Sequence, residues 1–360
     1  MVMEQCLSPV PGGTGRYALE VAAAVAARPG VHVTGWAAWH RDLTAARAAG
    51  VAGPARLLLP RRPLIAAWER GRGGPIRGAD VVHAPTLLAP PRGSAPLVVT
   101  VHDAVPWTHP ETLTPRGVRW HRAMADRVAR TADVVVVPTH AVRRALAGQL
   151  VLPRVVVVGE GATPQLRSAP ADADLRRQRM ALPASGFLLS LATIEPRKGL
   201  DVLLAALADP ASPDLPLLVV GQAGWGGLDP LQMARDLGLP DGRVRLLGRV
   251  SDADLAVALQ DATALVVPSR AEGFGLPVLE GMAAGIPVVT SDDPALVEVG
   301  DGATRTAPVG DAPALARVLT EVVGDPGERE RMVAAGRQRA AASTWDAAAA
   351  QLVDLYDSLG

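Results

Sequence analysis

Residues 267–291 read Val-Pro-Ser-Arg-Ala-Glu-Gly-Phe-Gly-Leu-Pro-Val-Leu-Glu-Gly-Met-Ala-Ala-Gly-Ile-Pro-Val-Val-Thr-Ser. The order of apolar and glycine-rich pieces predicts a strand, a turn, a short helix and a second strand. Gly273 and Gly275 permit positive φ angles in the turn, so its N–H groups can approach a ligand without obstruction by a Cβ atom. Pro277 suits the first turn of the helix, and Gly285 suits its end. The N–H groups and the dipole of such a helix start favour an anion, and a diphosphate fits.

Two carboxylates flank this helix start. Glu272 follows the expected strand Leu265–Pro268, and Glu280 lies one turn into the helix. Together with the anion site they suit a sugar nucleotide, whose phosphates and hydroxyls both need partners. Each feature alone also has a structural explanation, because a glutamate near a helix start often only complements the dipole and Gly-Phe-Gly can be a simple loop. The combination, rather than any single residue, indicates a binding site.

The spacing of Glu272 and Glu280 resembles the E-x7-E donor-site signature of the family 4 retaining glycosyltransferases. The wider chain resembles that family from Gly12 to about Ser343. The resemblance implies the GT-B fold, an α/β architecture in which two Rossmann-like domains with doubly wound parallel sheets face a central cleft. It also implies transfer of a sugar from a nucleoside diphosphate sugar with retained anomeric configuration, without a metal and without a cofactor beyond that donor.

Short apolar runs alternate with helical patterns along the chain, which also predicts doubly wound parallel sheets. Strands of the first half are expected at Val31–Trp36, Val81–His83, Leu97–His102, Val134–Pro138 and Val155–Val158. Strands of the second half are expected at Phe187–Ala192, Leu217–Gly221, Val244–Leu247, Leu265–Pro268 and Pro287–Thr290. Helices are expected between them, at Thr114–Thr131, Leu200–Ala208, Ser251–Asp261 and Ala312–Val323.

A chain of 360 residues exceeds what one core usually holds, so two domains are expected. We assign residues 1–165 to an acceptor-binding domain and residues 185–344 to a nucleotide-sugar-binding domain. The polar, proline-marked residues 166–184 are expected to link them, and a helix over residues 345–360 is expected to cross back to the first domain. Only Met1–Glu4 precede the first helix as a candidate strand, so either the chain as given begins a few residues late or its first strand is stunted.

Charge is distributed unevenly over the two halves. Residues 1–165 contain 19 basic and 10 acidic side chains, whereas residues 166–360 contain 17 and 26. The basic half holds two arginine groups: Arg116, Arg119, Arg122, Arg127 and Arg130 on one expected helix, and Arg61, Arg62, Arg70, Arg72 and Arg77 upstream of it. Such a basic helix can lie on an anionic membrane, meet an anionic acceptor, or be an ordinary solvated face. Nucleic acid is not expected as a partner, because aromatic residues make up only 3% and do not interleave with the arginines.

The expected location is the cytoplasm, with peripheral contact at the inner face of the cell membrane left open. No apolar run reaches membrane-spanning length, and Gly12, Gly13 and Arg16 interrupt any secretory signal. The single cysteine, Cys6, excludes an internal disulfide and fits a reducing compartment. No metal site is expected, because His and Cys do not cluster and no Asp-x-Asp pair of the kind that metal-dependent transferases use is found; the pair at residues 172–174 lies in the expected linker.

The chain has one lysine, Lys198, against 35 arginines. Where arginine has replaced lysine almost everywhere, the position that kept lysine is one that needs a compact ammonium. Lys198 lies in Glu195-Pro196-Arg197-Lys198-Gly199, after the first strand of the second half, and suits a phosphate ligand. Chance survival of one surface lysine is the alternative. The segment resembles the family's donor-phosphate Arg/Lys pair, although Ala192-Thr193 stands where many members have Gly-Arg, so Arg197 is the candidate guanidinium.

A second glycine-rich helix start lies at Pro11–Tyr17, with Thr14 as its expected cap. It resembles the family's loop that faces the donor phosphate and the acceptor. His102 and Asp103 end the strand Leu97–Val101, on the ligand side of a parallel sheet. An imidazole there can hydrogen-bond a sugar and transfer a proton, or simply cap the strand end. The family has a sugar-contacting histidine after this strand, and His102 matches it.

The residues expected to act fall into three groups. The catalytic group is His102, Glu272, Lys198 and Arg197. The donor is expected to contact Gly13, Lys198, Arg197, Val250, Gly273, Phe274, Gly275, Leu276 and Glu280, with Glu280 on the ribose and the backbone of Val250 on the base. The acceptor, a glycan or a lipid-linked molecule, is expected to meet Gly12, Gly13, Thr14, Arg16, Tyr17 and Asp103.

The sequence therefore favours a retaining hexosyltransferase of cell-envelope, polysaccharide or glycolipid synthesis. The Glu-Pro-Arg-Lys form inclines the donor towards GDP-mannose, by resemblance alone. Two other classes stay open. One is a catalytically silent homologue that binds sugar nucleotides, which the short first strand and the missing Gly-Arg favour. The other is a Rossmann-fold epimerase or dehydrogenase, although the chain has no G-x-G-x-x-G with an acidic residue about twenty positions on.

Overall fold

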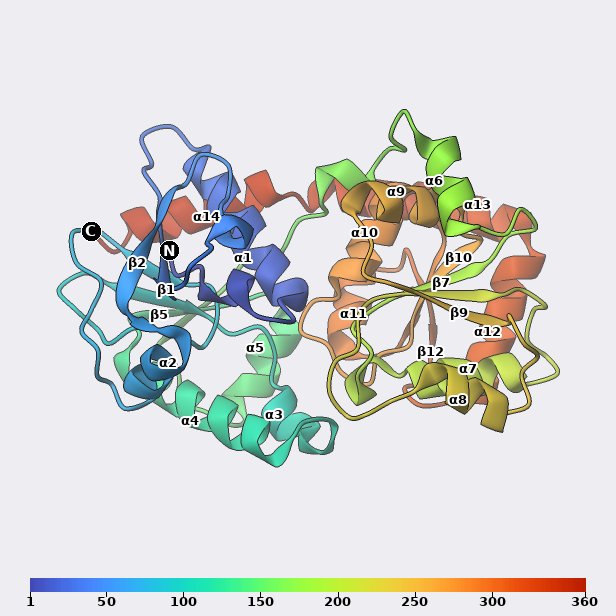
Figure 1. Ribbon diagram of the computed structural model, residues 1–360, viewed down its shortest axis with the longest axis horizontal. Helices are drawn as coiled ribbons and strands as arrows, with labels where there is room; N and C mark the ends of the chain where they lie inside the picture. The colour runs from blue at the N-terminus through green and yellow to red at the C-terminus, as the bar shows by residue number, and fades with distance from the viewer. The chain divides into compact units, whose positions relative to one another are not determined.

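The computed structural model describes residues 1–360, which form two compact units. Unit 1 comprises Met1–Pro110, Pro115–Gly161 and Thr344–Gly360, and unit 2 comprises Glu111–Thr114 and Ala162–Ser343. Figure 1 labels the helices and strands of both units. The last helix, α14 (Trp345–Asp357), thus belongs to the same unit as the amino-terminal residues.

Unit 1 is a layer of parallel strands with helices on both faces (Figure 1). A four-stranded sheet has the order β3-β4-β5-β6, and β1 and β2 pair separately. The strands are β1 (Thr34–Trp39), β2 (Ala52–Pro60), β3 (Val82–Ala84), β4 (Leu97–Thr100), β5 (Val134–Val137) and β6 (Arg154–Val157). The helices are α1 (Gly12–Ala26), α2 (Arg61–Glu69), α3 (Val105–Thr108), α4 (Pro115–Thr131) and α5 (His140–Ala147), with α14 packed beside α1. All residues of β4 and β5 are buried, as expected of parallel strands covered on both sides.

Residues 1–3 occupy the place of the short first strand. Val2 forms a parallel bridge with Trp36, and its N–H donates to the carbonyl of His83 at 3.0 Å. These contacts join β1 to β3, so that the two sheets of unit 1 meet along one short ladder. The chain then turns at Glu4 into a 3-10 helix, η1 (Glu4–Leu7).

Two strands of unit 1 differ from the prediction. β1 lies three residues later than the predicted Val31–Trp36, and β2 was not predicted. The sequence does not predict β2 because it is an edge strand, which tolerates proline and leaves Leu58 97% exposed. Its apolar residues therefore show no clear alternation. Each of the other nine predicted strands lies within two residues of its expected bounds.

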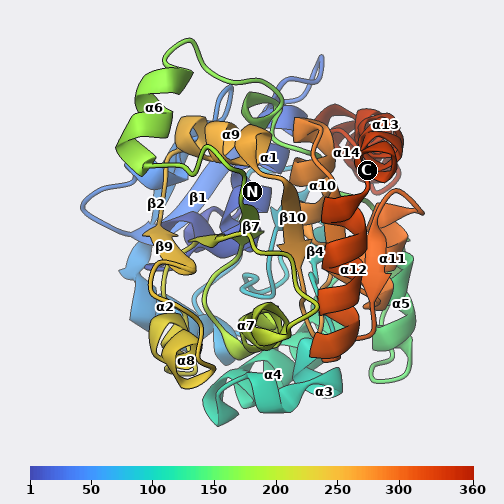
Figure 2. The ribbon, with the colours of Figure 1, turned by 90° about the vertical axis from the view of Figure 1, so that its right-hand side faces the viewer.

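Unit 2 is a six-stranded parallel sheet of order β12-β11-β10-β7-β8-β9. The strands are β7 (Leu188–Leu191), β8 (Leu217–Val220), β9 (Val244–Gly248), β10 (Ala264–Val267), β11 (Val288–Ser291) and β12 (Arg305–Ala307). Helices α7 (Leu200–Ala208), α8 (Pro230–Asp236) and α12 (Ala312–Gly324) lie on one face (Figures 1 and 2). Helices α6 (Ala173–Met180), α9 (Asp252–Asp261), α10 (Leu276–Ala284), α11 (Pro294–Gly300) and α13 (Pro326–Ala342) complete the unit. The strand order reverses between β7 and β10, and such a switch point is where ligands bind in open parallel sheets.

The predicted linker over residues 166–184 is wrong, because this segment is part of unit 2 and includes α6. Arg177 Nε donates to Asp261 Oδ2 at 2.6 Å, and Arg176 Nη1 donates to Asp254 Oδ1 at 2.8 Å. The segment looks like a solvated linker in the sequence because its many charges pair with α9 rather than contributing to an apolar core.

Candidate functional site

The turn before α10 is built as the sequence predicts, with one difference. Gly275 caps the helix with a φ of +93°, and a Cβ on it would lie 2.4 Å from Leu296 Cδ2. Gly285 ends the helix with a φ of +79°. Gly273 does not adopt a positive φ, so only one of the two expected glycines uses that freedom. No side chain caps the start of α10 and no acidic residue lies in its first turn, which leaves the helix start suited to an anion.

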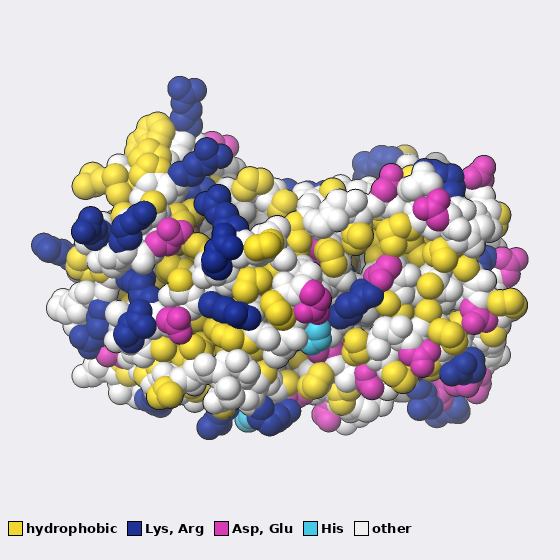
Figure 3. All heavy atoms as spheres, turned by 90° about the horizontal axis from the view of Figure 1, so that it is seen from below, with side chains coloured by type: hydrophobic (Ala, Val, Ile, Leu, Met, Phe, Trp, Pro, Cys, Tyr) yellow, Lys and Arg dark blue, Asp and Glu magenta, His cyan; other side chains and the backbone are white.

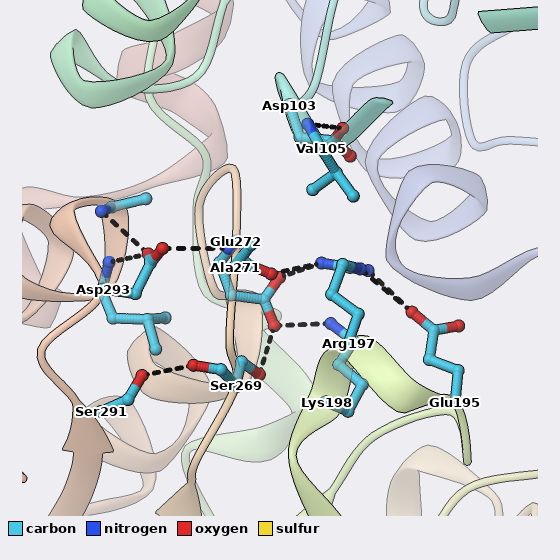
Figure 4. A network of polar contacts seen from close by, with 12 residues as sticks. Asp103, Val105, Glu195, Arg197, Lys198, Ser269, Ala271, Glu272, Ser291 and Asp293 are labelled. Carbon is cyan, nitrogen blue, oxygen red and sulfur yellow. Dashed lines mark hydrogen bonds and ion pairs between the residues drawn. The ribbon is translucent and has the colours of Figure 1, made fainter. Parts of the chain in front are cut away.

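Glu272 is the centre of a buried ionic cluster at this turn (Figure 4). Its Oε1 accepts from Lys198 Nζ at 2.6 Å and from Ser269 Oγ at 2.7 Å. Its Oε2 accepts from Arg197 Nη1 at 2.8 Å. Burial by itself would raise the pKa of Glu272, but the charges of Lys198 and Arg197 and the hydrogen bonds from Lys198 and Ser269 outweigh it and lower the pKa to about 2. The carboxylate is therefore charged at every physiological pH.

The two cations are held by the turn after β7. Arg197 also donates to Glu195 Oε1 at 3.1 Å and to the carbonyl of Ala271 at 2.9 Å. Glu195 is 2% exposed, and this burial raises its pKa. Lys198 ends η5 (Pro196–Lys198), with only 15% of its side chain exposed. The single lysine of the chain is thus not a surviving surface residue but a partner of Glu272.

The topology explains why these residues meet. Arg197 and Lys198 follow β7, and Glu272 follows β10, which is the neighbouring strand across the switch point. Because all strands are parallel, their carboxyl ends lie at one edge of the sheet. Lys198 and Arg197 therefore form one site with Glu272, although 74 and 75 positions of sequence separate them from it.

Asp293 is a further member of this edge that the sequence reading missed. It follows β11, is 6% exposed, and caps α11 by accepting from the N–H groups of Ala295 at 2.9 Å and Leu296 at 3.2 Å. It also accepts from the N–H of Glu272 at 3.4 Å, so it fixes the backbone that carries the central carboxylate. Its position directly before Pro294 is a helix-start signal that could have identified it.

A test of Asp293 uses pH. Burial raises the pKa of Asp293 from 3.8 to about 6. The folded state therefore holds this proton more tightly than the unfolded state, so the stability it contributes is present at low pH and is lost as pH rises from about 4 to 6. Asp293→Asn keeps the cap without the charge and is expected to gain stability relative to wild type over this window, on the order of 2 kcal/mol. Thermal unfolding of both proteins at pH 4 and pH 7 measures the difference, and an offset that does not change with pH would contradict the expectation.

The other expected donor residues lie near this cluster or on the same helix. Phe274 and Leu276 are buried beside Gly273 and Gly275, and Glu280 on α10 is 3% exposed. Val250 lies in the loop between β9 and α9 and is half-buried. The structure therefore brings Lys198, Arg197 and Glu272 into direct contact and places Glu280 one turn further along α10.

The glycine-rich segment of unit 1 differs from its prediction. α1 begins at Gly12, with a φ of +60°, and no side chain caps it. Thr14 lies inside the first turn and donates to the carbonyl of Pro11 at 3.2 Å, so the predicted Thr14 cap is wrong. The helix starts earlier than expected because Pro11 already has a helical backbone. Gly12 and Gly13 are exposed, and the side chain of Arg16 is half-buried.

Tyr17, expected to meet the acceptor, lies in the core of unit 1 instead. It is 1% exposed, and its hydroxyl lies 3.2 Å from Thr100 Oγ1. A helical residue five positions after Gly12 turns towards the sheet rather than towards solvent, which the sequence reading did not consider. Asp103, by contrast, is half-buried after β4 and accepts from the N–H of Val105 at 3.0 Å.

His102 stands at the carboxyl end of β4, as predicted, but its nitrogens face into the unit. Nε2 lies 2.8 Å from the carbonyl oxygen of Pro85, and Nδ1 lies 3.6 Å from Glu160 Oε1. The imidazole also packs edge to face on Tyr17, with ring centroids 4.7 Å apart. Burial lowers the pKa of His102, but the nearby carboxylate of Glu160 outweighs it and raises that pKa above its ordinary value. Glu160 is a site residue that sequence reading missed, since only the fold brings the end of β6 to the end of β4.

The five arginines of α4 do not form one exposed face. Arg127 is buried and donates to the carbonyl of Ala89 at 2.9 Å, and Arg122 donates twice to the carbonyl of Pro106. Arg116, Arg119 and Arg130 are exposed. Two of the five arginines thus serve the fold.

Two further observations concern metal ions and membranes. No group of three His, Cys, Asp or Glu side chains within residues 1–360 is arranged to hold a metal ion. Among the helices of the structure, none is both long and apolar enough to cross a bilayer.

Comparison with known proteins identifies the family. The chain matches the family described as "Glycosyl transferases group 1" over residues 173–339 and that described as "Glycosyltransferase Family 4" over residues 11–165. It is 30% identical over 312 residues to O-antigen chain mannosyltransferase B of Escherichia coli, a match that covers 84% of this chain and 79% of that one. Phosphatidyl-myo-inositol mannosyltransferase of Mycobacterium leprae is 37% identical over 170 residues, covering 46% of this chain and 44% of that one.

Comparison with solved structures identifies the fold. Anabaena HepE in complex with UDP-glucose superposes with a TM-score of 0.75 at 20% identity, covering 99% of this chain and 98% of that one. The likeness at this identity concerns the fold alone, and it agrees with two Rossmann-like units built on parallel sheets. The chain belongs to the glycosyltransferases that combine a family 4 amino-terminal domain with a group 1 carboxyl-terminal domain, and it has the GT-B fold.

Proposed function

We propose that this glycosyltransferase is an active, retaining, metal-independent enzyme that moves a hexose from a nucleoside diphosphate sugar to an acceptor hydroxyl. The observation that carries the proposal is the cluster of Lys198, Arg197 and Glu272 at the switch point of unit 2. Two cations on one buried carboxylate are matched to the charge of a diphosphate, whose oxygens can take the place of the carboxylate as acceptors.

The chemistry assigned to these residues is charge stabilisation. In the proposed reaction the bond between the anomeric carbon and the phosphate oxygen breaks, and a bond to the acceptor oxygen forms on the same face of the sugar. The acceptor proton passes to the departing phosphate oxygen, so no dedicated base is required. Lys198, Arg197 and the N–H groups of residues 273–276 would stabilise the charge growing on the diphosphate, the largest effect in many such reactions.

The remaining roles rest on the family resemblance. Glu280 is assigned to the ribose hydroxyls, the backbone of Val250 to the base, and Glu272 to the sugar ring as well as to the two cations. Unit 1 is assigned to the acceptor through the start of α1 and the residues after β4. A glycan or lipid-linked acceptor of cell-envelope or polysaccharide synthesis is the first candidate.

Mannose from GDP-mannose is the first candidate donor, because the two relatives named above are called mannosyltransferases. UDP-glucose is the second, because the similar solved structure contains it. A calorimetric panel of GDP, UDP, ADP and their sugar conjugates decides between them. The proposal fails if none binds the wild-type protein.

Catalysis itself needs a separate test. Incubating the bound sugar nucleotide with candidate acceptors, with and without EDTA, should release the nucleoside diphosphate at equal rates, and proton NMR of the product should show a retained anomeric configuration. A protein that binds the donor but never turns it over would be the catalytically silent homologue. Family membership leaves the epimerase or dehydrogenase alternative without support.

Peripheral membrane contact is the proposed location, carried by the surface around α2. Leu58 at the end of β2 is 97% exposed, and Arg62, Arg70, Arg72 and Arg77 are exposed nearby in the chain. Figure 3 shows basic side chains gathered over unit 1 among apolar ones. An exposed apolar side chain amid arginines suits the interface of an anionic bilayer.

Vesicle sedimentation tests this surface. The protein is expected to bind vesicles that contain anionic phospholipid and not neutral ones, with binding that falls as salt is raised. The double change Arg70→Gln and Arg72→Gln should weaken binding by roughly 30-fold, since each basic residue near the surface contributes about 1 kcal/mol. Arg317→Gln, which changes an exposed arginine on α12 of unit 2, is the control. Equal binding to neutral vesicles, or no effect of the double change, would rule this surface out.

A further inference from the structure

His102 is surrounded in a way that only its charged form satisfies. Its Nε2 lies 2.8 Å from the carbonyl oxygen of Pro85, which can only accept, so Nε2 carries a hydrogen. Its Nδ1 lies 3.6 Å from a carboxylate oxygen of Glu160. A neutral ring protonated at Nε2 would direct the lone pair of Nδ1 at that carboxylate, which is repulsive. A ring protonated on both nitrogens donates towards both oxygens.

The other groups that face His102 do not change this conclusion. Tyr17 from α1 offers a ring edge, and its hydroxyl is bonded to Thr100. His83 from β3 lies between the hydroxyls of Thr100 and Tyr356, at 2.8 and 2.6 Å, and burial lowers its pKa to about 3. It is therefore neutral and does not repel a charged neighbour. Asp103, the next residue in the chain, adds a second negative charge that favours the imidazolium.

His83 and His102 form a natural comparison. His83 is the middle residue of β3, His102 follows the adjacent strand β4, and both are largely buried. His83 faces only hydroxyls, whereas His102 faces the carboxylate of Glu160. Only 4% of the Glu160 side chain is exposed. A buried carboxylate without a cationic partner is costly, and so is a buried imidazolium without an anionic one. The pair at Glu160 and His102 is stable because each supplies the charge that the other needs.

The position of Glu160 is fixed by its neighbours in the chain. A Cβ on Gly161 would lie 2.1 Å from the backbone nitrogen of Trp345 and 2.6 Å from the carbonyl carbon of Thr344. The backbone after Glu160 therefore packs directly on the start of α14. The ring of Trp345 in turn packs on Tyr17, with centroids 5.9 Å apart, and Tyr17 packs on His102. This closed ring of contacts leaves the carboxylate little freedom to move away from the imidazole.

We propose that Glu160 is a positioning residue that keeps His102 as a fixed imidazolium, with both ring nitrogens held by protein oxygens, so that His102 does not act as a base. The inference rests on the proposed function only in placing a substrate at this edge of the sheet. With Nε2 on the carbonyl of Pro85 and Nδ1 facing Glu160, neither ring nitrogen is available to accept a proton from a substrate. No proton is transferred to or from His102 during turnover, in contrast to the role expected from the sequence.

Two-bond proton–nitrogen NMR spectra of the histidine rings in the whole chain test the charge directly. At pH 7 the wild-type ring of His102 should show both nitrogens protonated, and His83 should stay neutral from pH 5 to 9 as the internal control. Spectra of His102→Gln and His83→Gln assign the two signals. In Glu160→Gln the amide oxygen can still accept a hydrogen bond, yet the charge is gone, so the midpoint of His102 should fall by at least about one pH unit.

A neutral His102 in the wild-type spectrum at pH 7 would overturn the proposal, even if the variant failed to fold. An unchanged midpoint in a folded Glu160→Gln protein would overturn it too. Turnover of the bound sugar nucleotide gives the functional readout: Glu160→Gln should lose at least tenfold activity at pH 8, and it should lose less at a pH below the midpoint that the spectra give for His102 in that variant. A purely structural role would lower activity equally at both pH values. If no sugar nucleotide binds, the proposed function is wrong, but the NMR measurement still decides whether His102 is charged.

Discussion

Replacing Lys198 with alanine is expected to weaken the binding of a nucleoside diphosphate by roughly 100-fold, which corresponds to about 3 kcal/mol. The ammonium lies 2.6 Å from Glu272 and is the only lysine of the chain, placed at the switch point of the unit 2 sheet. A buried, hydrogen-bonded cation of this kind contributes far more to anion binding than a surface charge. Isothermal calorimetry with GDP and UDP measures the loss.

Glu272→Gln is the matched variant with the opposite expectation. Glu272 neutralises Lys198 and Arg197 in the ligand-free protein, so an incoming diphosphate has to compete with it for the two cations. Removing its charge should tighten diphosphate binding, by up to about tenfold, because the cations then have no internal counter-ion. If Glu272 also faces the sugar ring, turnover should fall although the product binds better.

The pair of variants separates a phosphate site from a structural ion pair. In a structural pair, both changes would lower stability and neither would alter diphosphate affinity in a specific direction. Lys198→Arg is the further control, since a planar guanidinium keeps the charge but does not fit the geometry of a compact ammonium. The phosphate-site assignment is wrong if Lys198→Ala binds GDP and UDP as well as the wild-type protein does.

The donor half of the site could be predicted from the sequence because its residues lie next to strong local signals. Glu272 precedes a helix start marked by Gly275 and Pro277, and Lys198 follows an unmistakable apolar strand. The rule that parallel strands end at one edge then brings the two together without any knowledge of side-chain positions. The rule did not predict that Lys198 and Arg197 contact the carboxylate of Glu272 directly.

Residues whose roles depend on strand order were missed or misplaced. Glu160 meets His102 only because the segments after β6 and β4 turn towards each other, and Asp293 meets Glu272 because β11 is the neighbour of β10. Tyr17 was misplaced because the orientation of α1 about its own axis decides whether a side chain points to solvent or to the sheet. Hydrophobic periodicity locates elements along the chain but does not fix these tertiary neighbours.

The fold shows the same division. Buried strands such as Val134–Val137 are continuous valine runs and were located within two residues. Edge strand β2 and the segment containing α6 escaped, because one exposes its apolar residues and the other satisfies its charges on α9. Both are elements whose stability comes from neighbours rather than from their own apolar content.

Gly199→Ala is expected to destabilise unit 2 by about 3 kcal/mol, well beyond the usual effect of a glycine substitution. Gly199 has a φ of +66°, and a Cβ there would lie 2.0 Å from the carbonyl oxygen of Pro268. The left-handed backbone alone costs an alanine about 1 kcal/mol. The remaining cost arises because the Cβ meets the backbone just after β10, which cannot move aside as a flexible side chain could.

Gly227→Ala supplies the matched control, because Gly227 has the same φ of +66° and a Cβ there meets nothing within 4 Å. Its expected cost is the backbone term alone, about 1 kcal/mol. Urea unfolding of both variants measures the difference, and calorimetry with GDP and UDP tests the site, because the turn that holds Lys198 against Glu272 must shift to admit the new methyl group. Gly199→Ala should therefore lose both stability and diphosphate affinity, while Gly227→Ala loses a little stability and no affinity. If the two variants lose equal stability, the turn after β7 can move to accommodate the methyl group at no extra cost. The packing of Gly199 on Pro268 would then not hold the contact between Lys198 and Glu272 in place.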